Sequence, residues 1–208
     1  MELLLGVLPY LGSGFFGAAL TYGLAYGRER RRSLDAYHAP QRQAIGDIVA
    51  ATHELMLREL ELRTVQTELI QCIRQDRLPG DELTAQLMTG TAAFGKATLD
   101  AERAFQIGRL TIVDAPCWEA MGAAYFELSN LRRTMAARVD APDMQTPEEI
   151  EAYVDTIKRL AEQFNHSVLA MVIAAADRVS PAETLRNRRH RDAARGRLGE
   201  RYRGPSES

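Results

Sequence analysis

The chain has 208 residues, a formal net charge of −2 and only two cysteines. Two cysteines are too few for a disulfide framework, and the lack of a net basic charge argues against a nucleic-acid-binding protein. The charge is unevenly distributed: residues 28–32 carry +3, residues 181–208 carry +4 and Glu2 carries −1, which leaves −8 on residues 33–180. These observations indicate one domain of ordinary size with an acidic body between two basic ends.

The N-terminal run Leu3–Tyr26 contains twenty-four residues without a charge. At about 1.5 Å per residue, a helix of this length reaches roughly 36 Å, enough to cross a hydrocarbon core of about 30 Å. Residues 1–27 are therefore predicted to form a transmembrane anchor. The arginines that follow favour a single-pass cell-membrane protein with its N-terminus outside and its main domain in the cytoplasm. They are Arg28, Arg30, Arg31 and Arg32.

Two alternatives to this anchor stay open, a cleaved signal peptide and an inverted segment. Ala25-Tyr26-Gly27 resembles a small-residue cleavage site, but the residues before the run, Met1-Glu2, lack the positive charge of a signal peptide. Ala19, Gly23 and Gly27 recur every fourth residue and would make a flat helix face. Such a face favours homo-oligomers through the membrane helix, although glycine is also common in membrane helices generally.

Pro40 is predicted to interrupt the helix that leaves the membrane, which makes residues 28–40 a basic juxtamembrane segment. A long helix is then expected over 42–77, ended by Pro79-Gly80. Its apolar residues recur every seven positions, at Ile48, Leu55, Leu62 and Leu69. Two pairs four residues apart, Glu54–Arg58 and Glu59–Arg63, are expected on its exposed face.

A second helix is predicted over 82–108, and residues 110–113 are expected to be extended. Its packing face carries Leu87, Phe94, Ala101 and Gly108, with further small residues that permit close helix contact. The third helix is expected to start at Asp114-Ala115-Pro116 and to end near Val139. The residues predicted to face inward on it are Trp118, Met121, Tyr125, Leu128, Met135 and Val139. Both cysteines, Cys72 and Cys117, are expected to behave as buried small hydrophobes.

The fourth helix has a clear start, because Thr146, Pro147 and Glu149 form a capping-box pattern. Its apolar stripe continues to about residue 176, and residues 167–176 are apolar nearly all round. That half is therefore expected at the centre of the bundle. No window alternates like a strand, so we predict an all-α chain. The membrane helix would be followed by an antiparallel up-down four-helix bundle over 41–180.

Residues 181–208 are predicted to form a short arginine-rich helix and a disordered tail. The candidate contacts to anionic lipid or to an acidic partner are the junction arginines named above and four arginines of this tail. Docking onto the acidic body and plain solvation stay open as alternatives, and nucleic acid is the weakest of them because the tail has only Tyr202 for stacking. The four tail residues are Arg186, Arg188, Arg189 and Arg191.

The sequence carries no pattern of known chemistry. His53-Glu54 begins like a zinc-protease motif, but Leu57 stands where the second histidine is needed. Glu162 precedes His166 by four residues, whereas di-metal bundles need a spacing of three. No phosphate loop or nucleophile elbow occurs. We therefore predict no catalytic residue, no cofactor site, no metal site and no enzyme.

The chain resembles a loose group of single-pass membrane proteins of GC-rich Gram-positive bacteria. The similarity lies in the Gly/Ala-rich anchor, the arginine-rich exit and the stretch 107–128 with its Asp114-Ala115-Pro116 break. It implies an anchored cytoplasmic helical domain, no known activity and no functional residue. The leading hypothesis is an interaction or scaffold protein whose partners are the bilayer, a second copy and an unknown protein. A ligand-sensing bundle, with a pocket left by the small-residue second helix, and an unrecognised enzyme are the alternatives.

Overall fold

The computed structural model describes residues 2–139, 146–179, 189 and 193–194; the side chains of 2–21, 31, 138, 139 and 177 are not described. The described residues form helices and no strand, which confirms the all-α prediction. The helices are α1 (Glu2–Arg74), α2 (Asp81–Thr111), α3 (Ala115–Val139) and α4 (Pro147–Arg178). The predicted helix and tail over 181–208 lie almost wholly outside the described residues.

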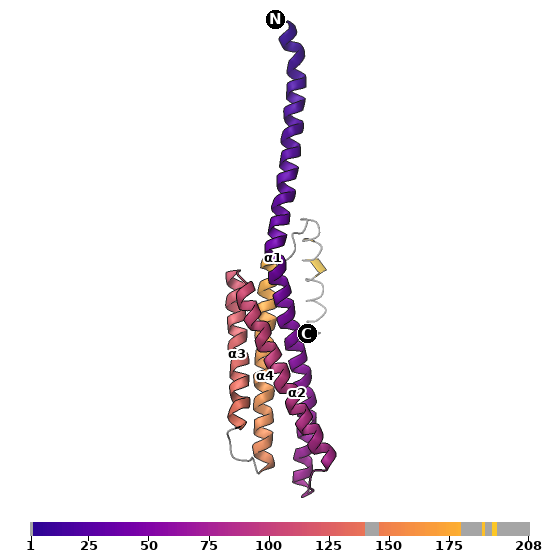
Figure 1. Cartoon of the computed structure of the whole chain (residues 1–208), viewed down its shortest axis with the longest axis vertical. Helices are drawn as coiled ribbons and strands as arrows, with labels where there is room; N and C mark the ends of the chain where they lie inside the picture. Colours follow the sequence, from indigo (N-terminus) through magenta and orange to yellow (C-terminus); the bar gives the residue numbers. More distant parts are fainter. Residues whose placement is uncertain (1, 140–145, 180–188, 190–192, 195–208) are drawn as a thin grey trace, which may run out of the picture. The chain divides into compact units, whose positions relative to one another are not determined.

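The chain divides into two compact units, residues 1–39 with 180–208, and residues 40–179. In the second unit, successive helices run in opposite directions, as an up-down bundle requires (Figure 1). All four helices contribute side chains with no exposed surface to its core. Examples are Leu55 of α1, Phe105 of α2, Leu131 of α3 and Phe164 of α4. The helical-bundle prediction is therefore confirmed for residues 40–179.

The predicted break at Pro40 is wrong, because α1 is a single helix through this residue. Proline removes one backbone N–H and so leaves the carbonyl of Ala36 without its helical partner. Ala36 and Pro40 are both exposed, so water can satisfy that carbonyl. At its other end α1 stops at Arg74, three residues before the predicted end. There Asp76 adopts a left-handed conformation with φ 49°, which aspartate tolerates better than most residues.

The α2–α3 connection is shorter than predicted, since α2 continues to Thr111 and only residues 112–114 leave the helix. Its backbone is held by Gln41 of α1, which is 1% exposed. The Gln41 Oε1 atom accepts hydrogen bonds from the backbone N–H of Val113 at 3.1 Å and of Asp114 at 3.2 Å. A single buried amide thus ties the start of the bundle part of α1 to the α2–α3 turn.

Replacing Gln41 with alanine is expected to lower the free energy of unfolding by about 1–3 kcal/mol, because it removes a buried amide and leaves two part-buried backbone donors without this partner. Urea unfolding of the full chain followed by circular dichroism would measure this change. Replacing the exposed Gln43 of the same helix with alanine is the matched control and should be nearly neutral. Equal stability of the two variants would contradict the role given to Gln41.

The predicted inward face of α3 is confirmed at Met121 and Leu128, which are buried, and Tyr125 and Met135 pack against the core. The prediction is wrong for Trp118. Trp118 is 47% exposed, whereas its neighbour Cys117 is fully buried. The buried stripe of α3 follows the helical period through Cys117, Met121, Ala124, Leu128 and Leu131. The helical period of this stripe assigns the inward position to Cys117, which was predicted to be buried, and leaves Trp118 beside it. Burial raises the pKa of the Cys117 thiol to about 11, so this thiol stays protonated and unreactive at neutral pH.

The predicted start of α4 is confirmed. The Thr146 hydroxyl accepts from the backbone N–H of Glu149, and the Glu149 carboxylate accepts from that of Thr146, both at 3.3 Å. The expectation that the second half of α4 is buried all round is wrong, because Leu169 is 51% and Ile173 is 68% exposed. The helix α4 therefore packs against the bundle through one stripe of residues. This stripe continues to Val179, just after the end of the helix.

Gly108 of α2 lies where this helix packs closely against side chains of α1 and α3. A Cβ atom there would lie 2.9 Å from Ile48 Cδ1 and 3.1 Å from Met121 Sδ. Replacing Gly108 with leucine is expected to lower the free energy of unfolding by about 1–3 kcal/mol through overpacking. Gly46 of α1 has no atom within 4 Å of an added Cβ and serves as the control. Urea unfolding should show Gly46→Leu to be neutral or slightly stabilising, and an equal loss in both variants would contradict this account.

Candidate functional site

A pocket lies in the half of the bundle that is nearer to the α1–α2 turn. There α1 and α4 remain in contact through Ile70, Ile150 and Val154, which form a small buried cluster. An ion pair of 2.6 Å between Arg74 and Glu151 closes the same contact at the surface. In the ribbon view α2 runs obliquely away from α3 toward this end (Figure 1). The pocket in this half is lined by side chains of all four helices.

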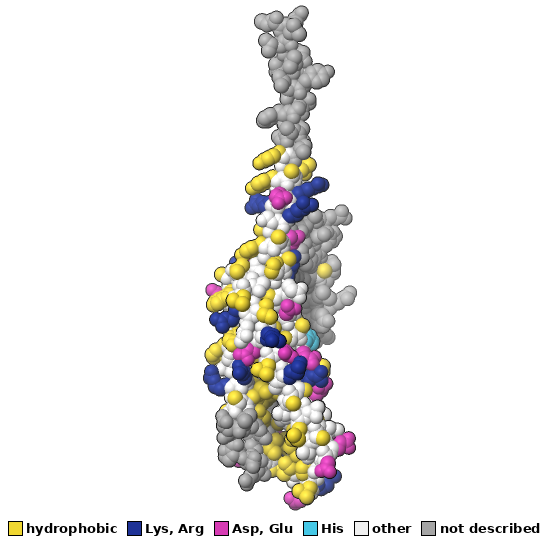
Figure 2. Space-filling model, in the orientation of Figure 1, with side chains coloured by type: hydrophobic (Ala, Val, Ile, Leu, Met, Phe, Trp, Pro, Cys, Tyr) yellow, Lys and Arg dark blue, Asp and Glu magenta, His cyan; other side chains and the backbone are white. Residues whose placement is uncertain are grey.

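The pocket has a volume of about 480 Å³ and is open on one side. Most of its wall is apolar, and Figure 2 shows hydrophobic side chains in the hollow at the lower part of the molecule. All four helices contribute to the wall. The lining residues are Glu59, Leu62 and Gln66 of α1; Leu87, Thr91, Phe94, Gly95, Thr98 and Leu99 of α2; Arg132, Met135 and Ala136 of α3; and Tyr153, Val154 and Ile157 of α4.

The small residues of α2 act in two ways. A Cβ at Gly90 would lie 3.3 Å from Leu62 Cδ1, so Gly90 lets α2 approach α1 closely. Gly95, one and a half turns further along α2, lines the pocket and has no atom within 4 Å of an added Cβ. The missing side chain at Gly95 therefore leaves space that no neighbouring residue fills.

Glu59 is the buried acidic group of the pocket wall, with 4% of its surface exposed. Its Oε1 atom lies 3.5 Å from Nε of Arg63, one turn along α1. Burial raises the pKa of the Glu59 carboxyl above its ordinary value, although Arg63 and Lys158 oppose this and Glu162 adds to it. A carboxylate in a mainly apolar wall is costly for folding, because burial removes water that would solvate the charge.

Two other polar side chains of the wall, Thr98 and Arg132, are engaged within the bundle. The Thr98 hydroxyl donates to the backbone carbonyl of Phe94 at 2.9 Å. Arg132 forms an ion pair of 2.5 Å with Glu102 of α2, and the Arg132 side chain is 53% exposed. The positive charge at the rim is thus balanced, and Glu59 is the acidic residue of a mostly apolar wall.

Comparison with known proteins does not assign this pocket. No family model, curated protein or solved structure matches the chain. The chemistry of the site is therefore the guide to its function. Among the residues that the structure describes, no group of three or more His, Cys, Asp or Glu side chains could hold a metal ion.

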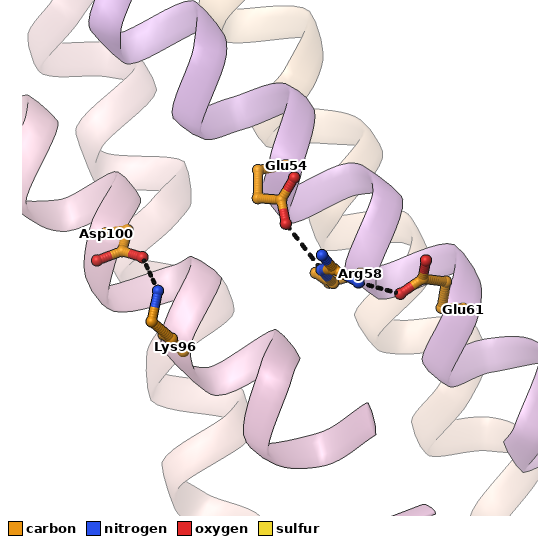
Figure 3. A network of polar contacts seen from close by, with 5 residues as sticks. All are labelled: Glu54, Arg58, Glu61, Lys96 and Asp100. Atoms are coloured by element: carbon orange, nitrogen blue, oxygen red, sulfur yellow. Dashed lines mark hydrogen bonds and ion pairs between the residues drawn. The ribbon is translucent and has the colours of Figure 1, made fainter. Parts of the chain in front are cut away.

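The predicted position of Glu59 is wrong. The Glu59–Arg63 pair was expected on the exposed face, but its carboxylate is buried. The expectation holds for Glu54 and Arg58, which pair at 2.8 Å on the surface. Figure 3 shows Arg58 between Glu54 and Glu61, beside the Lys96–Asp100 pair of α2. These exposed pairs carry no buried charge and are ordinary surface contacts.

A signal for Glu59 was present in the sequence. A second row of residues spaced by seven runs along α1 beside Leu55 and Leu62: Ile45, Thr52, Glu59, Gln66 and Ile73. Its two ends are apolar and its middle three members are polar. Thr52 and Glu59 are buried and Gln66 lines the pocket, so this row faces inward along its whole length.

None of the candidate contact residues predicted from the sequence, the small residues of the anchor and the arginines of the two basic ends, lines the pocket. Gly23 and Gly27 are described, and an added Cβ at either would meet no atom within 4 Å. The side chain of Ala19 is outside the described residues. Arg28, Arg30 and Arg32 are exposed, as is Arg189. The side chain of Arg31 and the residues Arg186, Arg188 and Arg191 lie outside the described part of the chain.

Among the described residues, no helix has an apolar stretch that could cross a membrane. Most of the predicted anchor Leu3–Tyr26 falls on positions 2–21, whose side chains are not described. The anchor therefore stays a prediction from the sequence.

Proposed function

We propose that this chain is a membrane-anchored protein whose cytoplasmic helical bundle binds a small, largely apolar ligand in the four-helix pocket. The observation that carries the proposal is the pocket itself, with its volume of about 480 Å³, its apolar wall and the single buried carboxylate of Glu59. Ligand sites in proteins are typically mostly apolar, with few polar groups and volumes of roughly 300–1,000 Å³. We therefore favour a ligand-sensing bundle over an interaction or scaffold protein.

A pocket of this kind is costly if it serves no purpose. Apolar side chains that line an open pocket face water, so they forgo the roughly 25 cal/mol per Å² that burial of apolar surface contributes to folding. Occupancy by a ligand would recover this free energy, and this supports a binding role over a packing defect.

The predicted anchor fits the same role. Apolar small molecules partition into membranes, so a receptor held at the bilayer meets them at a higher local concentration than one in bulk water. The uncharged run Leu3–Tyr26 and the arginines behind it support an N-terminus outside and a bundle on the cytoplasmic side.

The binding of a neutral, apolar fluorophore tests the proposal. The full chain would be placed in lipid nanodiscs and titrated with N-phenyl-1-naphthylamine, and the signal of empty nanodiscs would be subtracted. We expect saturable fluorescence enhancement with one site per chain. A signal that stays linear and equals that of empty nanodiscs would contradict the proposal.

A second proposal is self-association through the membrane helix, because Gly23 and Gly27 present an open face. The double substitution Gly23→Leu and Gly27→Leu should reduce the crosslinked dimer in membranes several-fold, since the added side chains keep two helices apart. Gly46→Leu, an open glycine of α1 outside the anchor, is the control. Unchanged crosslinking in the double variant would remove this proposal.

A further inference from the structure

We infer that the pocket selects amphiphiles that carry a protonated amine, with the ammonium group paired to the Glu59 carboxylate and the hydrophobic tail among the apolar side chains. The inference rests on the proposed ligand-binding function and goes beyond it in naming the chemical class. It is carried by the placement of one buried carboxylate in the wall of an otherwise apolar space.

Glu59 has unused capacity to accept hydrogen bonds. Among the described residues, Arg63 is its one ion-pair partner, and the distance of 3.5 Å is longer than the 2.7–2.9 Å of a charge-assisted hydrogen bond. A carboxylate offers about four lone-pair sites on two oxygens. An ammonium group carries three donors and a full positive charge, so it can fill the sites that Arg63 leaves open.

The charges around Glu59 favour a cation over an anion. From its own helix it is faced by Arg63, and from α4 by Lys158 and Glu162, which balance one another. From α3 the rim carries Arg132, whose charge is balanced by Glu102 of α2. Arg63 thus matches the formal charge of Glu59, but only across a contact of 3.5 Å that leaves acceptor sites of the carboxylate open. An anionic head would be repelled by Glu59, a neutral head would exclude water without replacing the charge interaction, and an ammonium head would donate hydrogen bonds to the carboxylate.

The size of the pocket suits a short amphiphile. If each heavy-atom-sized group takes about 30 Å³, the share of a water molecule in the liquid, the pocket holds roughly sixteen such groups. Phe94 and Tyr153 offer aromatic faces, and the leucines of α1 and α2 offer aliphatic ones. A chain of a few carbons that ends in a ring would place its apolar part against these groups while its amine reaches Glu59.

Three probes of the same shape test the inference: 4-phenylbutylamine, 4-phenylbutanol and 4-phenylbutanoate. Each would be titrated by calorimetry at pH 7 into the full chain in nanodiscs of neutral lipid, with empty nanodiscs subtracted. We expect the amine to bind at least tenfold more tightly than the alcohol, and the acid to bind most weakly. Glu59→Gln should bring the amine to within threefold of the alcohol. Glu61→Gln, an exposed glutamate on the same helix, should leave the tenfold preference intact.

The outcomes separate the two proposals. Equal binding of amine and alcohol by the unmodified chain would overturn the inference and leave the ligand-binding function standing. If none of the probes binds and N-phenyl-1-naphthylamine also fails, both fall. If a second copy covers the pocket, the probes fail and Leu99→Cys forms a disulfide-linked dimer, which likewise overturns the inference. If Glu59→Gln does not fold, Glu59→Asp takes its place, because its carboxylate lies one methylene closer to the backbone of α1. The preference for the amine should then fall while the alcohol still binds.

Discussion

Replacing Gly95 with leucine is expected to weaken ligand binding by more than tenfold while the bundle stays folded. Gly95 lines the pocket, and an added Cβ would meet no atom within 4 Å, so the new side chain would extend into the free volume. The backbone at this position is helical, and leucine is favoured over glycine in a helix by up to about 1 kcal/mol. The free energy of unfolding should therefore stay the same or rise.

Gly46→Leu is the matched control for this prediction. Gly46 is also a helical glycine with open space around it, but it lies on the exposed side of α1, away from the pocket. Both variants should gain similar helix propensity, and only Gly95→Leu should lose binding of N-phenyl-1-naphthylamine. If both variants bind the fluorophore as tightly as the unmodified chain, the ligand does not occupy this pocket.

Replacing Glu59 with leucine is expected to raise the free energy of unfolding by about 1–4 kcal/mol at neutral pH. Exchanging a buried ion pair for well-packed apolar side chains is often stabilising by this amount. Arg63, which would lose its partner, has 28% of its side chain exposed and can turn its charge to water. The same variant should lose the preference for an amine. A residue that lowers stability and governs binding is typical of a functional site.

The gain in stability should depend on pH in a defined direction. Burial raises the pKa of the Glu59 carboxyl above its ordinary value of 4.5. Between 4.5 and this raised pKa, the folded chain holds the Glu59 proton more tightly than the unfolded chain does. The stability contributed by this group is therefore complete below pH 4.5 and is lost as pH rises through the raised pKa.

Urea unfolding of the full chain and of Glu59→Leu at pH values from 4 to 8 would measure this effect. The stability difference between the two should be smallest at the acidic end, grow with pH and then level off. Glu61→Gln, whose side chain is exposed, should follow the unmodified chain throughout. A leucine variant that is less stable than the unmodified chain across the range would contradict the cost assigned to the buried carboxylate.

Helix starts and buried positions in the bundle could be predicted where they depend on residues of the same helix. The capping box at Thr146 and Glu149 fixes the start of α4, because both backbone donors have side-chain acceptors in the sequence. The rows of residues spaced by seven on α1 and α2 predicted burial of Ile48, Leu55 and Phe94. These features depend on neighbours within a turn or two of the same helix, which a sequence records directly.

Features that depend on contacts between helices were missed. Pro40 was expected to break α1, but the freed carbonyl of Ala36 is exposed and can bind water, so the helix continues. Glu59 was given to the exposed face because it pairs with Arg63, and the inward row that contains it was overlooked. The pocket could be named only as an alternative, because its volume depends on how far α2 diverges from α3.

Photolabelling would show whether a ligand occupies the pocket of the bundle. The full chain in nanodiscs would be exposed to a diazirine derivative of 4-phenylbutylamine, illuminated, and digested for peptide mapping by mass spectrometry. We expect labels on pocket residues such as Glu59, Met135 and Tyr153, with loss of the labels in the presence of excess 4-phenylbutylamine and in Gly95→Leu. Labels that resist competition and fall on exposed apolar residues such as Leu110 would contradict a ligand-binding pocket in this bundle.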